Sequence, residues 1–223
     1  MKAMILAAGL GTRLRPLTLN TPKPLVLVNG KALIEYHLEN LAKAGFTDIL
    51  INHAWLGEQV EAALGDGSRW GVNISYSPEG EPLETGGGDY CVLDRLSNDG
   101  VGFVVINGDI LSDFDFSSLQ CLQPDVAHLI LVGNPQHNPE GDFSCKPSGK
   151  VGMQGDKQTF SGISVLTPKL FVGCDAGAFP LGPLLKSAIV KGEVSGSIYH
   201  GVWIDVGTQE RLEQAENHIK ENR

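Results

Sequence analysis

Short apolar runs alternate with segments of helical periodicity over the first 130 residues. The apolar run at 3–8 predicts a buried strand, and the spacing of Leu33, Leu38 and Leu41 predicts a helix that ends at Gly45. The same two signals predict further strands at 48–52, 72–77 and 101–106 and further helices at 56–64 and 90–96. Strands that alternate with helices favour an α/β fold, with a largely parallel sheet covered by helices on both faces. Ligands of such sheets bind at the carboxyl ends of the strands.

The pattern weakens after residue 134. Residues 134–143 are rich in Pro, Asn and Gly, and short β-like pieces follow at 150–153 and 159–166. We interpret this region as a β-rich excursion that faces a substrate, and not as a linker. A helix at about 181–191, a strand that ends near 203 and an amphipathic C-terminal helix complete the expected elements.

Composition limits the size and the partners of the protein. With 223 residues, 42% of them hydrophobic, the chain can bury the core of one domain, which we expect to span 1–223. Acidic side chains outnumber basic ones by 26 to 17, which disfavours nucleic acid or an anionic membrane as the main partner. The first 34 residues differ, because they carry five basic side chains and no acidic one and leave a net charge of −14 for the remainder. The sequence predicts one positive zone in an acidic protein.

Cysteine spacing and apolar runs bear on the compartment. No pair of Cys residues and no His spacing suits a zinc site, so we expect reduced thiols. Gly and Arg interrupt the first apolar run too early for a signal peptide, and no later run approaches the ~20 apolar residues of a membrane helix. We expect a cytoplasmic protein.

A glycine-rich segment follows the first predicted strand directly. Residues 9–16 read Gly-Leu-Gly-Thr-Arg-Leu-Arg-Pro, in which two glycines let backbone N–H groups approach an anion and two arginines supply charge. A plain turn with solvated arginines is the alternative. Leu14 stands where a dinucleotide fingerprint has its third glycine, and no Gly-Lys-Ser/Thr is present for a P-loop. The segment is a candidate phosphate cradle of another kind.

One lysine downstream of this loop is held between two prolines. Lys23 lies between Pro22 and Pro24, which fix the backbone on either side and so restrict the ammonium group. We predict that Lys23 is a phosphate clamp.

Two aspartates lie at the ends of apolar strands. Asp109 follows the run 104–106, and Asp205 follows Trp203 and Ile204 near the C-terminus. A turn or a helix cap is the common role of such an aspartate. A divalent metal bound with a nucleotide usually takes one or two carboxylates, which this pair could supply.

A second glycine-rich segment occupies 79–88, with the sequence EGEPLETGGG ahead of a short predicted helix. Glycine is needed where a ring lies against the backbone. An ordinary turn would carry the same residues.

Taken together, these segments resemble the sugar-1-phosphate nucleotidylyltransferases. The match rests on MILAAGLGTRLRPLT with TPKPLVLV, and it continues at 79–88, 105–109 and 203–212. The resemblance implies a Rossmann-like, three-layer α/β nucleotidyltransferase fold with a mostly parallel central sheet and a small β-rich sugar-binding excursion. It also implies that 1–110 mainly binds nucleotide and 111–223 mainly binds sugar phosphate. Asp89 departs from the family pattern, because an apolar residue is expected at its position.

Residue roles follow from the same resemblance. Arg13 and Lys23 are implied as catalytic residues, and Mg²⁺ is implied on Asp109 and Asp205. The implied nucleotide contacts are Ala8, Gly9, Gly11, Thr12, Arg13, Lys23, Glu79, Gly86, Gly87 and Asp109. The implied contacts to the second substrate are Asn107, Glu140, Asp142, Ser161, Gly162 and Asp205.

The implied reaction joins UTP and N-acetylmuramate α-1-phosphate and yields UDP-N-acetylmuramate and pyrophosphate in cell-wall recycling. Mannose-1-phosphate guanylyl transfer and glucose-1-phosphate uridylyl or thymidylyl transfer share the same motifs and stay open as alternatives. A non-catalytic sugar-nucleotide sensor is the alternative from another class. We expect a monomer or weak homodimer, with no nucleic-acid or membrane partner.

Overall fold

The computed structural model describes residues 1–97 and 100–221. Its helices are α1 (Leu33–Lys43), α2 (Gly57–Leu64), α3 (Glu84–Cys91), α4 (Leu93–Leu96), α5 (Leu181–Lys191) and α6 (Gln209–Glu221). Its strands are β1 (Ala3–Leu6), β2 (Leu27–Val28), β3 (Lys31–Ala32), β4 (Asp48–His53), β5 (Asn73–Pro78), β6 (Phe103–Asn107), β7 (Ile110–Ser112), β8 (Ala127–Val132), β9 (Phe143–Cys145), β10 (Val151–Gly152), β11 (Lys157–Leu166), β12 (Val194–Tyr199) and β13 (Trp203–Asp205).

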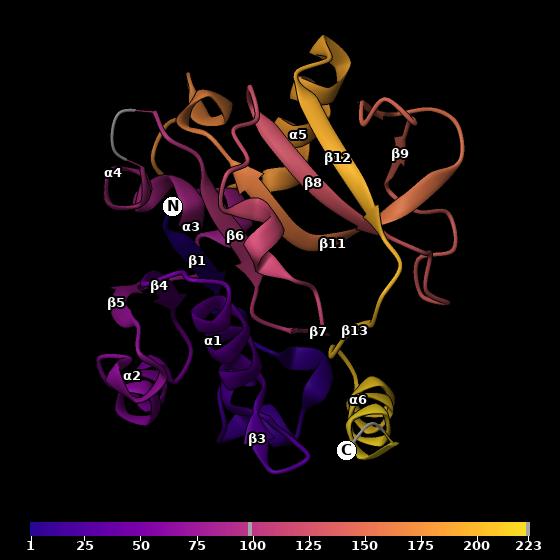
Figure 1. Cartoon of the computed structure of the whole chain (residues 1–223). Helices are drawn as coiled ribbons and strands as arrows, with labels where there is room; N and C mark the ends of the chain where they lie inside the picture. Colours follow the sequence, from indigo (N-terminus) through magenta and orange to yellow (C-terminus); the bar gives the residue numbers. More distant parts are fainter. Residues whose placement is uncertain (98–99, 222–223) are drawn as a thin grey trace.

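One large sheet organises the part of the chain that the structure describes (Figure 1). Its order is β10-β9-β11-β6-β1-β4-β5, and β8 and β12 extend it from β11. The strands β6, β1, β4 and β5 run parallel, as does the pair β8 and β12, whereas β11 runs antiparallel to β6 and to β8. The mostly parallel sheet of the prediction is confirmed, and β9, β10 and the start of β11 form the β-rich excursion.

Hydrophobic cores lie on both faces of this sheet. In β1, Ala3 and Ile5 pack in a cluster with residues of α1 and α2, while Met4 packs on the opposite face with residues of α4 and α5. Because successive side chains of a strand point to opposite faces, the strand serves two cores. The three-layer arrangement with helices on both faces is confirmed. Within the described ranges, no helix is both long and apolar enough to cross a membrane.

The second glycine-rich segment differs from the prediction. Helix α3 begins at Glu84, so Gly86 and Gly87 lie inside a helix, and the expected helix at 90–96 is divided into the end of α3 and α4. A Cβ on Gly86 would press against the Phe179 ring, and one on Gly87 would overlap the Gly177 carbonyl oxygen. These glycines are therefore needed because another segment packs closely on the helix, although glycine is otherwise unfavourable there.

Candidate active site

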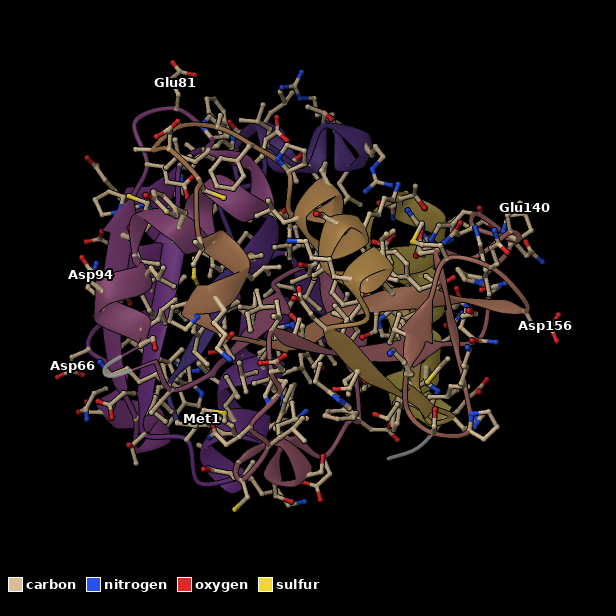
Figure 2. The ribbon with its side chains drawn as sticks, turned by 90° about the horizontal axis from the view of Figure 1, so that it is seen from above. Met1, Asp66, Glu81, Asp94, Glu140 and Asp156 are labelled. Atoms are coloured by element: carbon tan, nitrogen blue, oxygen red, sulfur yellow. The ribbon has the colours of Figure 1, made fainter. Side chains whose placement is uncertain are left out.

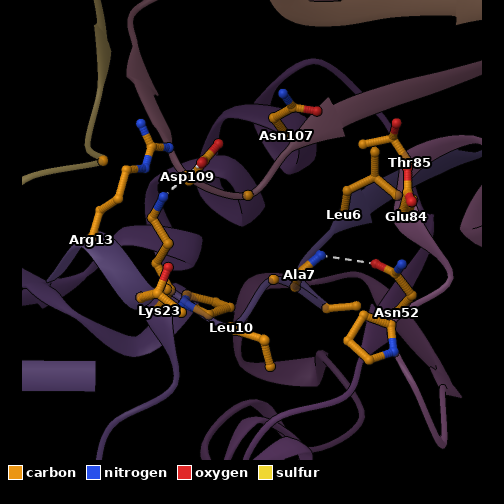
Figure 3. A pocket seen from close by; sticks show the side chains of 18 residues that line it. Leu6, Ala7, Leu10, Arg13, Lys23, Asn52, Glu84, Thr85, Asn107 and Asp109 are labelled. Carbon is orange, nitrogen blue, oxygen red and sulfur yellow. Dashed lines mark hydrogen bonds and ion pairs between the residues drawn. The ribbon is translucent and has the colours of Figure 1, made fainter. Parts of the chain in front are cut away.

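The carboxyl ends of three parallel strands place three residues in one row. Leu6 of β1 pairs in register with Asn52 of β4 on one side and with Asn107 of β6 on the other. A cavity of about 420 Å³ opens above this row. Its lining residues are Leu6, Ala7, Ala8, Gly9, Leu10, Gly11, Thr12, Arg13, Lys23, Pro24, Asn52, Pro82, Glu84, Thr85, Asn107, Gly108, Asp109 and Gly207 (Figure 3). We call it the first cavity.

The glycine loop that follows β1 forms one wall of the first cavity. Gly11 has a φ of 62°, which favours glycine, and a Cβ there would crowd the buried side chain of Thr18. Around Gly9, by contrast, the space is open. The predicted contacts Ala8, Gly9, Gly11, Thr12, Arg13, Lys23 and Asp109 all line this one cavity.

A partly buried ion pair lines one side of the first cavity. Lys23 Nζ lies 2.6 Å from Asp109 Oδ2, and the two residues are 86 positions apart in the chain. The lysine side chain is 10% exposed and that of the aspartate is 31% exposed, so the aspartate is the more accessible partner. Figure 3 shows this pair beside Arg13, opposite Asn52 and Thr85.

The two aspartates of the sequence analysis lie next to each other, Asp109 in the turn before β7 and Asp205 at the end of β13. Asp205 of β13 is paired with Ile110 of β7, and the Val206 N–H donates to the carbonyl oxygen of Asp109 at 2.8 Å. A small core that contains Ile204 and Val206 anchors this region. The fold thus joins residues that are 96 positions apart in the sequence.

Only one of the two carboxylate oxygens of Asp205 has a hydrogen-bond partner among the described residues. Its Oδ2 accepts a hydrogen bond from Arg211 Nη1 at 2.9 Å and lies 3.4 Å from His137 Nε2. Its Oδ1 is buried without a hydrogen-bond partner among the described residues. A Cβ built on Gly207 would lie 2.9 Å from that oxygen and 3.0 Å from Arg13 Nη2, so the carboxylate and the guanidinium approach one another across this glycine.

The donor set suits a divalent cation. No group of three or more His, Cys, Asp or Glu side chains that could hold a metal occurs in 1–97 and 100–221. Mg²⁺ needs no such group, because it is usually bound by one or two carboxylates together with water and ligand oxygens. Asp109 and Asp205 fit this pattern, and the unpartnered Oδ1 of Asp205 is an oxygen available to a cation.

At the other end of the first cavity, the lining includes Asn52 but not Glu79, whose expected nucleotide contact stays a prediction. Asn52 Oδ1 accepts from the Ala7 N–H at 2.8 Å, and its Nδ2 donates to Glu79 Oε1 at 2.7 Å. The other oxygen of Glu79 accepts from the Leu83 N–H. Glu79 is buried behind Asn52 and outside the cavity lining. A polar residue at the end of an apolar strand was the signal for Asn52.

Helix α3 contributes Glu84 and Thr85 to the first cavity, but not Gly86 and Gly87. The N–H groups of both glycines donate to the carbonyl oxygen of Phe179 at 3.0 Å. A base contact at Gly86 or Gly87, as the resemblance implied, stays a prediction.

Asp89 is the most unusual residue of this helix. It is fully buried, and neither carboxylate oxygen has a hydrogen-bond partner among the described residues. Burial raises the pKa of Asp89 well above its ordinary value, and the charge of Glu79 raises it further. The departure from the apolar residue of the family pattern therefore leaves a buried carboxyl group whose surroundings favour the neutral form.

A second cavity of about 430 Å³ adjoins the first, and both are lined by Thr85 and Asn107. Its other lining residues are Gly141, Asp142, Phe143, Met153, Lys157, Phe160, Leu181, Gly182, Leu185 and Lys186. We call it the second cavity. Asp142 and Asn107 of the predicted sugar contacts reach it, whereas Glu140 is exposed and lies near the edge of the molecule (Figure 2).

Ser161 and Gly162 lie behind the second cavity. The Ser161 hydroxyl is buried and donates to the carbonyl oxygen of Ile130. Gly162 has a φ of 81° at an irregularity in β11, and a Cβ there would overlap the Asn107 amide. In this structure Gly162 therefore makes room for Asn107, and the roles of both residues toward a sugar stay predictions.

The chain was compared with known proteins. A family model described as nucleotidyl transferase matches residues 2–145. N-acetylmuramate alpha-1-phosphate uridylyltransferase of Neisseria meningitidis serogroup B is 51% identical over 226 residues, which cover 97% of each chain. The catalytic subunit beta of mannose-1-phosphate guanylyltransferase from Danio rerio is 32% identical over 93% of this chain and 61% of that longer protein.

Solved structures share the fold. A candidate glucose-1-phosphate thymidylyltransferase from Bacillus anthracis superposes with a TM-score of 0.83 over 98% of this chain and 94% of that chain, at 22% identity. HddC from Yersinia pseudotuberculosis gives a TM-score of 0.77 over 98% and 99% of the two chains, at 24% identity. The family model and the relative from Neisseria show that the chain belongs to the nucleotidyl transferase family.

Proposed function

We propose that the protein transfers a uridylyl group from UTP to N-acetylmuramate α-1-phosphate, giving UDP-N-acetylmuramate and pyrophosphate. The observation that carries the proposal is that Arg13, Lys23 and Asp109 converge at one end of the first cavity. Asp205 lines neither cavity but lies directly behind Gly207 of this lining. The choice of base and sugar rests on the relative from Neisseria, whose name states this reaction and which is 51% identical. Peptidoglycan recycling in the cytoplasm is the setting that this reaction implies.

The chemistry brings together two anions that repel each other. An oxygen of the sugar 1-phosphate attacks the α-phosphorus of UTP in line with the departing pyrophosphate, so the protein mainly positions the groups and offsets negative charge. The N–H groups of the glycine loop, with Arg13 and Lys23, would bind the triphosphate. Asp109 and Asp205 would hold Mg²⁺, which when bound offsets phosphate charge. Arg211 keeps the Asp205 carboxylate in place.

The two cavities support the assignment of nucleotide binding and sugar-phosphate binding to different parts of the chain. Apart from Gly207, every lining residue of the first cavity lies within 1–110, which we assign mainly to the nucleotide. The second cavity is lined mainly by residues between 141 and 186, in the part assigned to the sugar phosphate. The reacting phosphates would meet near Asn107, which lines both.

A mannose-1-phosphate guanylyltransferase is the nearest alternative, since relatives with that name are 31–32% identical over 93% of the chain. A non-catalytic sensor is disfavoured because such a protein has no need of a carboxylate pair beside Arg13 and Lys23.

Release of pyrophosphate tests the proposal. Purified protein with Mg²⁺ would be given UTP, GTP or dTTP with the 1-phosphates of N-acetylmuramate, N-acetylglucosamine, glucose or mannose. We expect the highest kcat/KM with UTP and N-acetylmuramate α-1-phosphate. A preference for GTP with mannose 1-phosphate would favour the alternative, and no release from any pair would contradict an enzyme.

A further inference from the structure

The second cavity contains charge that the phosphate chemistry does not use. Lys157 at the start of β11 and Lys186 in α5 both line it. Among the described residues, neither ammonium group has an ion pair or a hydrogen bond to a side chain or carbonyl. Both lysines are therefore available to a ligand.

Asp142, the acidic residue in the lining, does not neutralise the two lysines. Asp142 Oδ2 already accepts two hydrogen bonds, from the Phe160 N–H at 2.8 Å and from Asn138 Nδ2 at 3.2 Å. Two cations and one carboxylate leave the cavity with a net positive charge. An anion is the ligand group that such a cavity favours.

The rest of the wall is mainly apolar. The apolar side chains are Phe143, Met153, Phe160, Leu181 and Leu185. Leu181 and Leu185 lie four positions apart and share one face of α5, and Gly182 and Lys186 are a second such pair that lines the cavity. The ligand group that fits is an anion attached to a small apolar unit.

The phosphate of the substrate is a poor match for these lysines. Transfer requires that phosphate beside the nucleotide, near Asp109 and Asp205, and these carboxylates do not line the second cavity. A neutral hexose would present only hydroxyl groups to the lysines. N-acetylmuramate differs from N-acetylglucosamine by a lactyl ether, which is a carboxylate on a carbon that also bears a methyl group.

Building on the proposed function, we propose that Lys157 and Lys186 bind the lactyl carboxylate and so select N-acetylmuramate over N-acetylglucosamine. The apolar wall would receive the lactyl and acetamido methyl groups. These lysines are specificity residues, and they take no part in the transfer itself.

The test compares two substrates that differ only in the lactyl group. Lys186→Met and Lys157→Met would be assayed with the 1-phosphates of N-acetylmuramate and N-acetylglucosamine, with UTP and Mg²⁺ held constant. We expect kcat/KM for the first substrate to fall about 10- to 100-fold, the range for losing a charge-assisted hydrogen bond, and for the second to change less than about twofold. Lys186→Arg should retain most of the selectivity. Lys191→Met, in the same helix, is the matched control.

A second measurement needs no variant. The methyl ester of N-acetylmuramate α-1-phosphate has lost the anion but kept the shape, so the wild-type enzyme should use it as poorly as N-acetylglucosamine 1-phosphate. Equal losses for both substrates would assign the lysines to the phosphate or to the fold and overturn the inference. Unchanged selectivity in both variants would also overturn it. Wild-type activity confined to mannose or glucose 1-phosphate would instead refute the proposed substrate, and the inference with it.

Discussion

The charged residues of the site are held by one another in the absence of substrate. Asp109 is paired with Lys23, and Asp205 is paired with Arg211. Each carboxylate is thereby oriented before a ligand arrives, which lowers the reorganisation needed during the reaction. The negative charge of each aspartate is therefore needed both for the pair and for the proposed cation.

We expect Asp109→Asn and Asp205→Asn each to lower kcat by about 100-fold or more, because each removes one preorganised charge from the phosphate site. Pyrophosphate release measures the effect, and the melting temperature checks the fold. Asp125→Asn is the control, since Asp125 forms only an exposed pair with Lys169. Near-normal turnover in both site variants would show that the metal lies elsewhere.

Asp89 presents the opposite situation, a carboxyl group with no partner among the described residues. Its pKa is raised by burial and by Glu79, so the folded protein keeps a proton that the unfolded chain releases near pH 4. The folded state consequently loses stability, relative to the unfolded chain, as the pH rises from about 4 toward the raised pKa.

Asp89→Val should therefore stabilise the protein. Removal of a buried, unsatisfied polar group is worth about 1–3 kcal/mol at pH 7, and Val and Asp have similar helix propensities. Urea denaturation at pH 5, 6, 7 and 8 measures the gain, which should grow with pH until the raised pKa of Asp89 is reached. Asp94→Val, at an exposed position of α4, should show no such growth. Equal stability of Asp89→Val and wild type at every pH would mean that an ordered water already satisfies the carboxyl group.

Among the elements, α3 links the two halves of the site. The N–H groups of Gly86 and Gly87 donate to the carbonyl oxygen of Phe179, and Thr85 Oγ1 accepts from the Leu181 N–H at the start of α5. A helix beside the nucleotide cavity is thus attached to a helix beside the second cavity. Small residues in α3 allow this close contact.

Gly87→Ala should separate these two elements. The added methyl group overlaps the Gly177 carbonyl oxygen, and overpacking of this kind typically costs about 1–3 kcal/mol. For a chain of this size we expect a fall of about 5 °C in the melting temperature, together with a raised KM for UTP because Glu84 and Thr85 shift. Gly133→Ala, where the space is open, is the control. An unchanged melting temperature would refute the contact.

Local patterns predicted these elements unequally. Periodicity located α1 and α5 well, because each is bounded by glycine or proline and presents one apolar face. The strand β7, which aligns Asp109 with Asp205, is three residues long and leaves no periodic signal. The start of α3 was missed because glycine normally argues against a helix, and only the packing of residues 177–179 explains it.

The sequence also predicted some residues of the candidate site and missed others. Gly9, Arg13 and Lys23 could be proposed from the sequence because they belong to contiguous motifs that imply phosphate chemistry, and all three line the first cavity. Asn52 and Lys186 could not, since each has its position only through a tertiary contact across the sheet or along a helix face.

At the scale of the whole molecule, the charge pattern is more local than the sequence indicated. Of the five basic residues in the first 34, only Arg13 and Lys23 line the first cavity. Lys31 instead forms an ion pair with Glu39, and Lys2 donates to the carbonyl oxygen of Arg95. A net charge of −9 would repel an anionic substrate in general, so these two cations should determine nucleotide affinity.

We therefore expect nucleotide binding to stabilise the folded protein through these side chains. UTP with Mg²⁺ at about 100 times its Kd should contribute about 2.7 kcal/mol, which corresponds to roughly 5–10 °C in the melting temperature. Arg13→Gln should reduce this shift at the same concentrations, whereas Arg69→Gln, at an exposed site, should not. A full shift in Arg13→Gln would exclude that residue from nucleotide binding.

The adjoining arrangement of the two cavities bears on how such a protein can diverge. Of the residues that the structure describes, only Thr85 and Asn107 line both cavities, while Asn52 lines the first and Lys186 the second. Mutations far from the common wall can alter preference for one substrate without disturbing the other. Related proteins could therefore change their preference for the base and for the sugar independently and keep the same reaction centre.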